Sequence, residues 1–370
     1  MNFPLRPNVR RMTPYSPGKP IAELQRERDV HPIVKLASNE NPLGPSPRAL
    51  EAIAAAAQHL HLYPDASGYA LRQALSAKYG LPPEQLVLGN GSDEIIHLLG
   101  QVLLGAETDE VIVGEPSFVR YDAAAHLANC RLVEVPLDAD LRHDLPAMAQ
   151  AVTEHTRLVF IANPNNPTGT IVDRVELDRF LDDLPPHVLV VLDEAYYEFA
   201  SADPAYPDSI ALVRAGRPVF GLRTFSKAYG LAGIRVGWGF GPAEVTDAIE
   251  RAREPFNVNS LAQAAAIAAL EDDAHLARTL DVNRRGMERL TAAFRASGVK
   301  WTESHANFVC VDLGRPARPI FEALLAHGVI VRPGDVLGLP NHLRISIGAD
   351  HEVDQFIGAW ETVVPGGVPA

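Results

Sequence analysis

The segment Thr224-Phe225-Ser226-Lys227-Ala228-Tyr229-Gly230-Leu231-Ala232-Gly233-Ile234-Arg235 decides how this chain is interpreted. It places one lysine among apolar residues and glycines, with the hydroxyls of Thr224 and Ser226 before it and Arg235 after it. Burial disfavours the ammonium form of a lysine, so the neutral amine of Lys227 would be accessible near neutral pH and could attack a carbonyl group. The two hydroxyls and the guanidinium of Arg235 are groups that bind a phosphate.

A reactive amine beside phosphate-binding groups is the arrangement that pyridoxal phosphate requires. The alternative for an isolated Ser-Lys pair is a surface loop with a solvated lysine. A cofactor site would also need groups for the ring and for the substrate from other parts of the chain.

Length and charge limit the possible functions. With 370 residues, the chain is expected to form a large domain and a smaller one. The 33 basic and 46 acidic residues give a net charge of -13, which argues against nucleic-acid and anionic-membrane partners. Cys130 and Cys310 lie far apart without a CxxC pattern, so neither a disulfide framework nor a metal site is expected. No secretion signal or membrane-spanning run is recognisable, and the cytoplasm is the expected location.

Short apolar runs alternate with helical or loop stretches through the first two thirds of the chain. They lie at 86–88, 111–113, 132–135, 158–161, 188–192, 219–222 and 236–240. This rhythm predicts an α/β fold whose large domain has three layers, with helices on both faces of a mostly parallel sheet of about seven strands. Ligands of such sheets bind beyond the carboxyl ends of the strands.

The C-terminal part has a different pattern. A long helix at 275–297 is followed by strands at 308–313, 329–331 and 343–347 around a helix at 319–327, which predicts a smaller α+β domain. The expected division is an N-terminal arm associated with the small domain (1–37), a large cofactor-binding domain (38–275) and the small domain (276–370).

Several predicted strand ends carry polar residues. Asp193 follows the apolar run 188–192, where a carboxylate is costly to bury unless it meets a cation such as the protonated pyridine nitrogen of the cofactor. Tyr196 and Asn166 could both reach the phenolic oxygen of that ring. The alternatives are an aspartate that caps the next helix and asparagines that only form turns.

Two further segments fit the same ligand. The turn 89–94 precedes an apolar helix, so the backbone N–H groups at Ser92 and Asp93 could bind a phosphate. The alternative is a helix that Ser92 or Asp93 simply caps. Phe118 is a candidate for stacking on the pyridine ring, although a lone aromatic residue is commonly part of a core.

Two arginines lie in apolar surroundings near the C-terminus. Arg344 is in Leu343-Arg344-Ile345-Ser346-Ile347, and Arg332 is in Val331-Arg332-Pro333-Gly334. An arginine inside an apolar strand needs an anion, and Arg344 could bind an α-carboxylate through two parallel hydrogen bonds. An internal salt bridge is the alternative.

Together these motifs resemble those of a known family, and the resemblance extends over nearly the whole chain. The motifs resemble those of fold-type I pyridoxal phosphate aminotransferases in order and spacing: Tyr63-Pro64-Asp65, Asn166-Pro167-Thr168-Gly169, Asp193-Glu194-Ala195-Tyr196, Ser226-Lys227 and Arg235. Three further motifs are similar to those of histidinol-phosphate aminotransferases: Asn8-Val9-Arg10 with Thr13-Pro14-Tyr15, residues 37–45, and Val331-Arg332-Pro333-Gly334.

The resemblance implies roles for these residues. Lys227 would carry the cofactor covalently, Asp193 would pair with the pyridine nitrogen, and Asn166 and Tyr196 would bind the phenolic oxygen. The cofactor phosphate would be held by the amides of Ser92 and Asp93 with Thr224, Ser226 and Arg235. Phe118 departs from some relatives, in which a tyrosine stands at that position.

The resemblance also implies a homodimer in which Tyr63 reaches the neighbouring site. Arg344 would receive the substrate carboxylate, and Tyr15 and Arg332 would meet the phosphate end. The implied reaction, in histidine biosynthesis, converts L-histidinol phosphate and 2-oxoglutarate into imidazole acetol phosphate and L-glutamate.

The alternatives on the same fold are an aromatic amino-acid aminotransferase and a threonine-phosphate decarboxylase. A non-catalytic binder would be expected to lack catalytic groups or to carry an added DNA-binding domain, and the sequence shows neither. For a nicotinamide-dependent dehydrogenase, the glycines of Gly237-Trp238-Gly239-Phe240-Gly241 have the wrong spacing.

Overall fold

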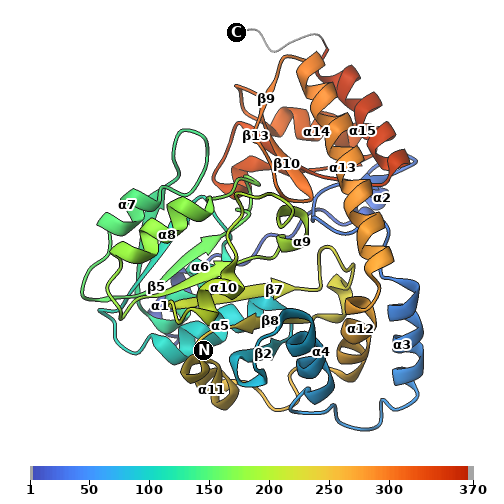
Figure 1. The fold of residues 1–370 in the computed structure, drawn as a ribbon. Helices are drawn as coiled ribbons and strands as arrows, with labels where there is room; N and C mark the ends of the chain where they lie inside the picture. Colours follow the sequence, from blue (N-terminus) through green and yellow to red (C-terminus); the bar gives the residue numbers. More distant parts are fainter. Residues whose placement is uncertain (1–2, 366–370) are drawn as a thin grey trace.

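The computed structural model describes residues 3–365, in which the larger of three sheets has seven strands (Figure 1). They are β2 (Leu86–Gly89), β3 (Glu110–Glu115), β4 (Arg131–Pro136), β5 (Thr156–Ala162), β6 (Leu189–Asp193), β7 (Val219–Thr224) and β8 (Gly237–Phe240). Their order is β2-β8-β7-β6-β5-β3-β4, and β8 runs in the direction opposite to the other six strands. The predicted mostly parallel sheet is confirmed.

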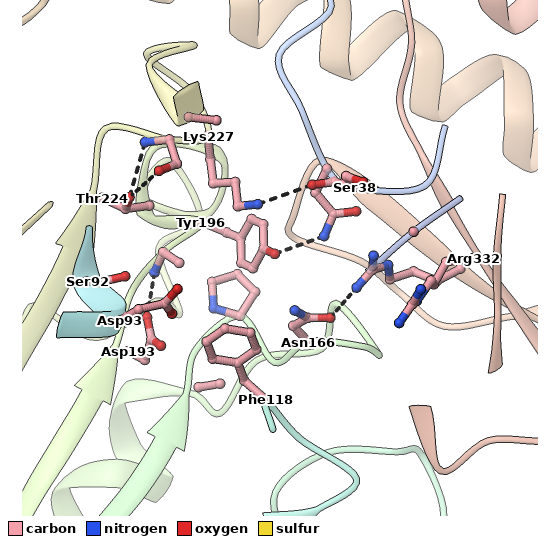
Figure 2. A pocket seen from close by; sticks show the side chains of 18 of the residues that line it. Ser38, Ser92, Asp93, Phe118, Asn166, Asp193, Tyr196, Thr224, Lys227 and Arg332 are labelled. Carbon is pink, nitrogen blue, oxygen red and sulfur yellow. Dashed lines mark hydrogen bonds between the residues drawn. The ribbon is translucent and has the colours of Figure 1, made fainter. Parts of the chain in front are cut away.

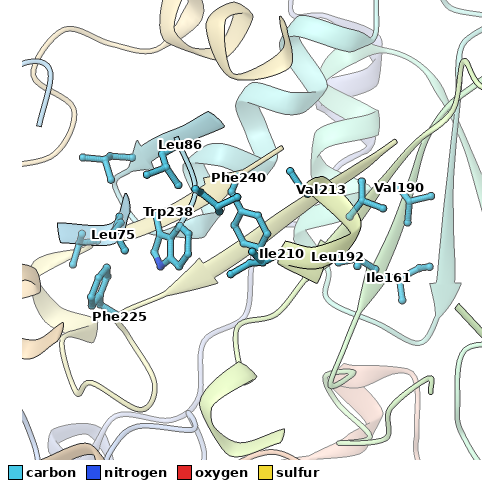
Figure 3. Close-up of a cluster of buried hydrophobic side chains, with 14 of the residues drawn as sticks. Leu75, Leu86, Ile161, Val190, Leu192, Ile210, Val213, Phe225, Trp238 and Phe240 are labelled. Atoms are coloured by element: carbon cyan, nitrogen blue, oxygen red, sulfur yellow. The ribbon is translucent and has the colours of Figure 1, made fainter. Parts of the chain in front are cut away.

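Helices cover both faces of this sheet because alternate residues of its strands are apolar on each side. On one face lie α5 (Ser92–Leu103), α6 (Arg120–Ala128) and α11 (Ala243–Ala252). On the other lie α3 (Pro47–Ala57), α4 (Tyr69–Tyr79), α7 (Leu145–Gln150), α8 (Arg174–Asp183), α10 (Ser209–Arg214) and α12 (Ser260–Leu270). Figure 3 shows Val190 and Leu192 of β6 near Ile210 and Val213 of α10. The three predicted layers are therefore present.

The C-terminal part forms a separate core around a four-stranded antiparallel sheet. Its order is β12 (Arg332–Pro333), β13 (His342–Ser346), β10 (Phe308–Asp312) and β9 (Lys300–Trp301). The flanking helices are α13 (Asp273–Ala296), α14 (Arg318–Ala326) and α15 (Asp350–Val363), and their aromatic residues Phe294, Phe356 and Trp360 are fully buried. We propose residue 275 as the domain boundary, although α13 continues across it.

The expected strand at 329–331 ends one residue early, and a second short strand that belongs to another sheet begins at residue 332. β11 (Val329–Ile330) pairs in parallel with β1 (Val34–Lys35), whereas β12 pairs with β13. The change of sheet brings Arg332 directly opposite Arg344 in the register of β12 and β13. This irregularity therefore places the two arginines side by side.

The N-terminal arm contacts both parts of the molecule. Its first helix, α1 (Pro7–Arg11), lies against α6, where Asn8 donates a hydrogen bond to the carbonyl of His126 over 2.6 Å. Leu24 of α2 (Ile21–Glu27) is buried in the core of the small sheet. The remaining short elements are α9 (Tyr197–Ala200) and the 3-10 turns Pro83–Gln85, Ala232–Ile234 and Gly334–Leu337. Over residues 3–365, none of the helices has the length and apolar character needed to cross a membrane.

Candidate functional site

A cavity lies beyond the carboxyl ends of β5, β6 and β7, between the large sheet and the small domain (Figure 2). The structure brings thirteen of the predicted site residues to its wall: Tyr15, Ser92, Asp93, Phe118, Asn166, Asp193, Tyr196, Thr224, Ser226, Lys227, Arg235, Arg332 and Arg344. They come from the N-terminal arm, the strand ends of the large sheet, the first turn of α5 and the small domain. Tyr63 is the one predicted site residue that does not line this cavity.

Lys227 extends into the cavity from the loop after β7. Its Nζ lies 3.3 Å from the backbone carbonyl oxygen of Ser38, a neutral acceptor. Burial lowers the pKa of Lys227 to about 8, and the positive charge of Arg344 adds to this effect. Roughly a tenth of the amine is therefore uncharged and nucleophilic at pH 7, far more than for a solvated lysine.

Asp193 lies at the end of β6, and both of its carboxylate oxygens accept hydrogen bonds. Tyr121 donates its hydroxyl to Oδ2 over 2.8 Å, and the amide of Ala195 donates to Oδ1 over 3.1 Å. Burial nevertheless raises the pKa of Asp193 to about 6. Within residues 3–365 no cation lies at ion-pair distance from this carboxylate, so it could pair with a cationic ligand atom.

Tyr121 was missed by the sequence reasoning. It follows Phe118 by three residues, about one helical turn, and its ring stacks on that of Phe160 with centroids 4.6 Å apart. Phe118 contacts the edge of Tyr121, with ring centroids 5.8 Å apart, and lines the cavity. This spacing was the available signal, because residues one turn apart lie on the same side of a helical segment.

The first turn of α5 forms a cradle with the loop that follows β7. The N-cap of α5 is Gly91, so the alternative of a Ser92 or Asp93 side-chain cap is not supported. A Cβ atom on Gly91 would lie 2.3 Å from Nη2 of Arg235, and one on Gly237 would lie 2.4 Å from the amide nitrogen of Ser92. The two glycines therefore keep this space open.

Hydroxyl and guanidinium donors line the same cradle. Oγ1 of Thr224 lies 3.0 Å from Oγ of Ser226, and Nη1 of Arg235 lies 3.5 Å from that oxygen. Nη2 of Arg235 also lies 3.6 Å from a carboxylate oxygen of Asp93. Free backbone N–H groups at a helix N-terminus, two hydroxyls and an arginine together make a phosphate-binding site.

The opposite wall connects the large sheet to the small domain. The hydroxyl of Tyr196 accepts a hydrogen bond from Nδ2 of Asn39 over 2.9 Å, and Oδ1 of Asn166 accepts one from Nη1 of Arg344 over 2.6 Å. Asn39 has a φ of 56°, in the left-handed region that asparagine tolerates better than most residues. In the sequence, Asn39 lies within a motif shared with the family, and no contact of its side chain is predicted from it.

Arg332 and Arg344 hydrogen-bond to neutral oxygens. Arg344 donates to the carbonyl of Ala37 over 2.7 Å as well as to Asn166, and its Nε has no hydrogen-bond partner among residues 3–365. Arg332 donates to the carbonyl of Ser16 over 2.5 Å. Burial lowers the pKa of both guanidinium groups, and neither has a carboxylate at ion-pair distance among the residues that the structure describes. The alternative of an internal salt bridge is therefore wrong.

Tyr63 lies on the surface of the chain. Its side chain is 82% exposed and stacks on Phe256, with ring centroids 4.7 Å apart. Tyr15, which does line the cavity, is also largely exposed, at 62%.

The residues of the cavity fit pyridoxal phosphate. Lys227 supplies the amine for its aldehyde, Asp193 supplies for its ring nitrogen a carboxylate that meets no cation within residues 3–365, and the cradle kept open by Gly91 and Gly237 suits its phosphate. The order of these groups along the cavity follows from the order of the strands that carry them.

Comparisons with known proteins agree with this chemistry. The profile of the family "Aminotransferase class I and II" matches residues 31–359. The histidinol-phosphate aminotransferase of Moorella thermoacetica is 50% identical over 352 residues, which cover 95% of this chain and 90% of that protein. Histidinol-phosphate aminotransferase 2 of Methylococcus capsulatus is 49% identical over 363 residues, 97% of each protein.

A solved structure is similar over almost the whole chain. The histidinol-phosphate aminotransferase of Sinorhizobium meliloti, in complex with pyridoxal 5'-phosphate, superposes with a TM-score of 0.90 at 31% identity and covers 98% of both chains. The present chain therefore belongs to the class I and II aminotransferases, within the histidinol-phosphate aminotransferase family, and its cofactor is pyridoxal phosphate.

Proposed function

We propose that this aminotransferase converts L-histidinol phosphate and 2-oxoglutarate into imidazole acetol phosphate and L-glutamate, a reaction of histidine biosynthesis. The observation that carries the proposal is the pair Arg332 and Arg344, which are buried, line the same cavity as Lys227 and are bonded to neutral oxygens. Two desolvated guanidinium groups favour anionic substrates, and both proposed substrates are anionic. The printed names of the relatives at about half identity support the same substrate.

We assign the proton transfer to Lys227. When bound, pyridoxal phosphate supplies an electron-withdrawing ring that makes a proton on the substrate's α-carbon removable. With a pKa of about 8, the amine of Lys227 can take up this proton and give it back near neutral pH. The carbonyl of Ser38, 3.3 Å from Nζ, orients the amine without neutralising a charge on it.

Four further groups are proposed to hold the ring. Asp193 would pair with the ring nitrogen, while Tyr196 and Asn166 would donate to the phenolic oxygen. Phe118 would stack on the ring face. The hydrogen bonds from Tyr121 and Asn39 support this proposal, because they fix Asp193 and Tyr196 before the cofactor arrives.

The phosphate and substrate contacts complete the proposal. The amides of Ser92 and Asp93, with Thr224, Ser226 and Arg235, would bind the cofactor phosphate. Arg344 would bind the substrate carboxylate, and Arg332 with Tyr15 would bind the phosphate end of the amino donor. Within residues 3–365 the Nε of Arg344 has no hydrogen-bond partner. This supports the assignment of Arg344 to the substrate carboxylate, because a buried donor without a partner favours an incoming acceptor.

Amino-group transfer from candidate donors tests the substrate. We expect glutamate to form from 2-oxoglutarate with histidinol phosphate at a kcat/KM far above that for phenylalanine or tyrosine. A higher kcat/KM with either aromatic amino acid would favour an aromatic aminotransferase. Release of carbon dioxide from threonine phosphate would favour a decarboxylase, and either result would overturn the proposal.

We further propose that two copies associate and that Tyr63 serves the partner's cavity. Tyr63 is strongly exposed, and Leu50, Leu60 and Leu62 near it in sequence are more than half exposed. An exposed apolar surface of this kind favours an interface. We also propose the cytoplasm as the location, since Cys130 and Cys310 are both free thiols. Sedimentation of the purified protein as a monomer at micromolar concentration would refute the dimer.

A further inference from the structure

A second group of charged and aromatic side chains lies behind the cavity, on the opposite face of the large sheet. Asp193 of β6 and Thr224 of β7 face the cavity, whereas their neighbours Glu194 and Arg223 point to the other side because successive residues alternate along a strand. Glu194 and Arg223 are each only 1% exposed. Neither lines the cavity, so neither is a candidate for contact with cofactor or substrate.

Glu194 and Arg223 connect the ends of β6 and β7. Nε of Arg223 lies 2.9 Å from Oε2 of Glu194, and the hydroxyl of Ser209 donates to the same oxygen over 2.8 Å. The backbone amide of Glu194 also donates to the carbonyl of Leu222 over 2.8 Å. The ion pair thus links the two strand ends that deliver Asp193 and the lysine loop.

Aromatic rings enclose the guanidinium group of Arg223. Its Cζ lies 3.3 Å from the ring centroid of Tyr197. The rings of Tyr79, Trp238 and Phe240 lie 5.1 to 5.5 Å from it. Trp238 and Phe240 belong to the apolar core on this face of the sheet (Figure 3). These contacts fix the guanidinium group from several directions.

Each main member of this cluster is adjacent in sequence to a cavity residue. Glu194 follows Asp193, Tyr197 follows Tyr196, and Arg223 precedes Thr224. Burial of an ion pair costs free energy that a well-packed apolar pair would not cost. Its presence behind three site residues therefore indicates a purpose other than stability.

We propose that Arg223 is a positioning residue that, through Glu194 and Tyr197, fixes the mutual spacing of Asp193, Tyr196 and the loop carrying Lys227. The proposal rests on the roles assigned above to these three residues. It does not depend on the identity of the amino donor. Loss of Arg223 should therefore loosen the cofactor site without removing any group that touches the cofactor.

Cofactor affinity of the apoprotein tests this proposal independently of the substrate. In Arg223→Met we expect the Kd for pyridoxal phosphate to rise about tenfold or more, the size of loss seen at metal sites when residues that orient the ligands are replaced, and kcat to fall. Arg72→Met is the matched control, because Arg72 is also a largely buried arginine, paired with Glu250 outside the cavity. It should lower the melting temperature of the apoprotein and leave the Kd unchanged.

Two further variants keep the test decisive. Arg223→Lys retains the charge and the path to Glu194 but loses the planar group that packs on Tyr197, so it should fold and still weaken cofactor binding. An unchanged Kd in Arg223→Lys and Arg223→Met would overturn the proposal.

The double variant Arg223→Met, Glu194→Gln removes both charges and should regain melting temperature but not cofactor affinity. Recovery of both would show that Arg223 only balances a buried charge, which also overturns the proposal.

Discussion

Replacement of Tyr121 by phenylalanine tests the assignment of Asp193 by removing a single oxygen atom. The Tyr121 hydroxyl donates to Oδ2 of Asp193 over 2.8 Å in a fully buried setting, and the ring itself packs on Phe160. Phenylalanine keeps the ring and its packing. The carboxylate of Asp193 then keeps only the hydrogen bond from the amide of Ala195.

The size of the effect follows from the lost hydrogen bond. A hydrogen bond to a charged acceptor contributes about 1.5 to 3 kcal/mol, and each pKa unit corresponds to about 1.4 kcal/mol. Loss of this bond should raise the pKa of Asp193 in the apoprotein by roughly one to two units above its present value of about 6. Only the ionised carboxylate pairs with a cationic ring nitrogen, so cofactor affinity declines as the pH falls through this pKa.

Equilibrium binding of pyridoxal phosphate to the apoprotein, measured between about pH 5 and pH 9, is the assay. In Tyr121→Phe the acidic decline in affinity should begin roughly one to two pH units higher, with affinity near that of the unmodified protein at alkaline pH. Tyr206→Phe is the matched control, because it removes another buried hydroxyl, the donor to the carbonyl of Asn163. An unshifted acidic decline in Tyr121→Phe, or an equal shift in the control, would refute the reasoning.

Three other predictions concern Lys227, Arg332 and Tyr63. The rate of covalent attachment of the cofactor to the apoprotein can be followed by borohydride trapping. This rate should fall about tenfold per pH unit below about pH 8 and level off above it, because the attacking amine must be neutral. A rate independent of pH would contradict the low pKa of Lys227. Arg332→Met should raise the KM for histidinol phosphate by about tenfold or more, and Arg332→Lys by less because it keeps the charge; equal KM values in steady-state assays would exclude a phosphate contact. Lys227→Ala and Tyr63→Ala subunits should each be inactive or weakly active alone. When the two are unfolded and refolded together, they should regain about a quarter of the native activity, because half of the dimers would contain one complete site. No gain in activity would argue against sharing of Tyr63 between subunits.

The strand-end residues could be predicted from the sequence because two simple rules apply to them. Apolar runs such as 188–192 mark buried strands, and the residues that follow them gather at one edge of a parallel sheet. Asp193 is predicted in this way, whereas Lys227 is predicted from its setting among apolar residues and glycines, with hydroxyls and an arginine nearby. The roles of the groups that complete the site, and the family itself, came from the resemblance in motifs and not from periodicity.

Contacts across long sequence separations could not be predicted. Tyr121 reaches Asp193 across 72 residues, and Asn39 reaches Tyr196 across 157. The reversed strand β8 was also expected only as one more strand, because its apolar run does not encode direction. The separation of β11 from β12 depends on pairing with β1 and β13, two segments about 300 and 10 residues away.

One property of strands links the predictable part of the site to the unpredicted part. A site built on strand ends exposes every second residue to the ligand, so the residues between them must face the opposite layer. Asp193 and Thr224 face the cavity. Their sequence neighbours Glu194 and Arg223 form a buried ion pair over 2.9 Å. A charged residue next to a site residue on a buried strand is therefore a signal in its own right, because burial requires it to have a partner. Its partner should lie at the same level of the neighbouring strand, as Arg223 does beside Glu194.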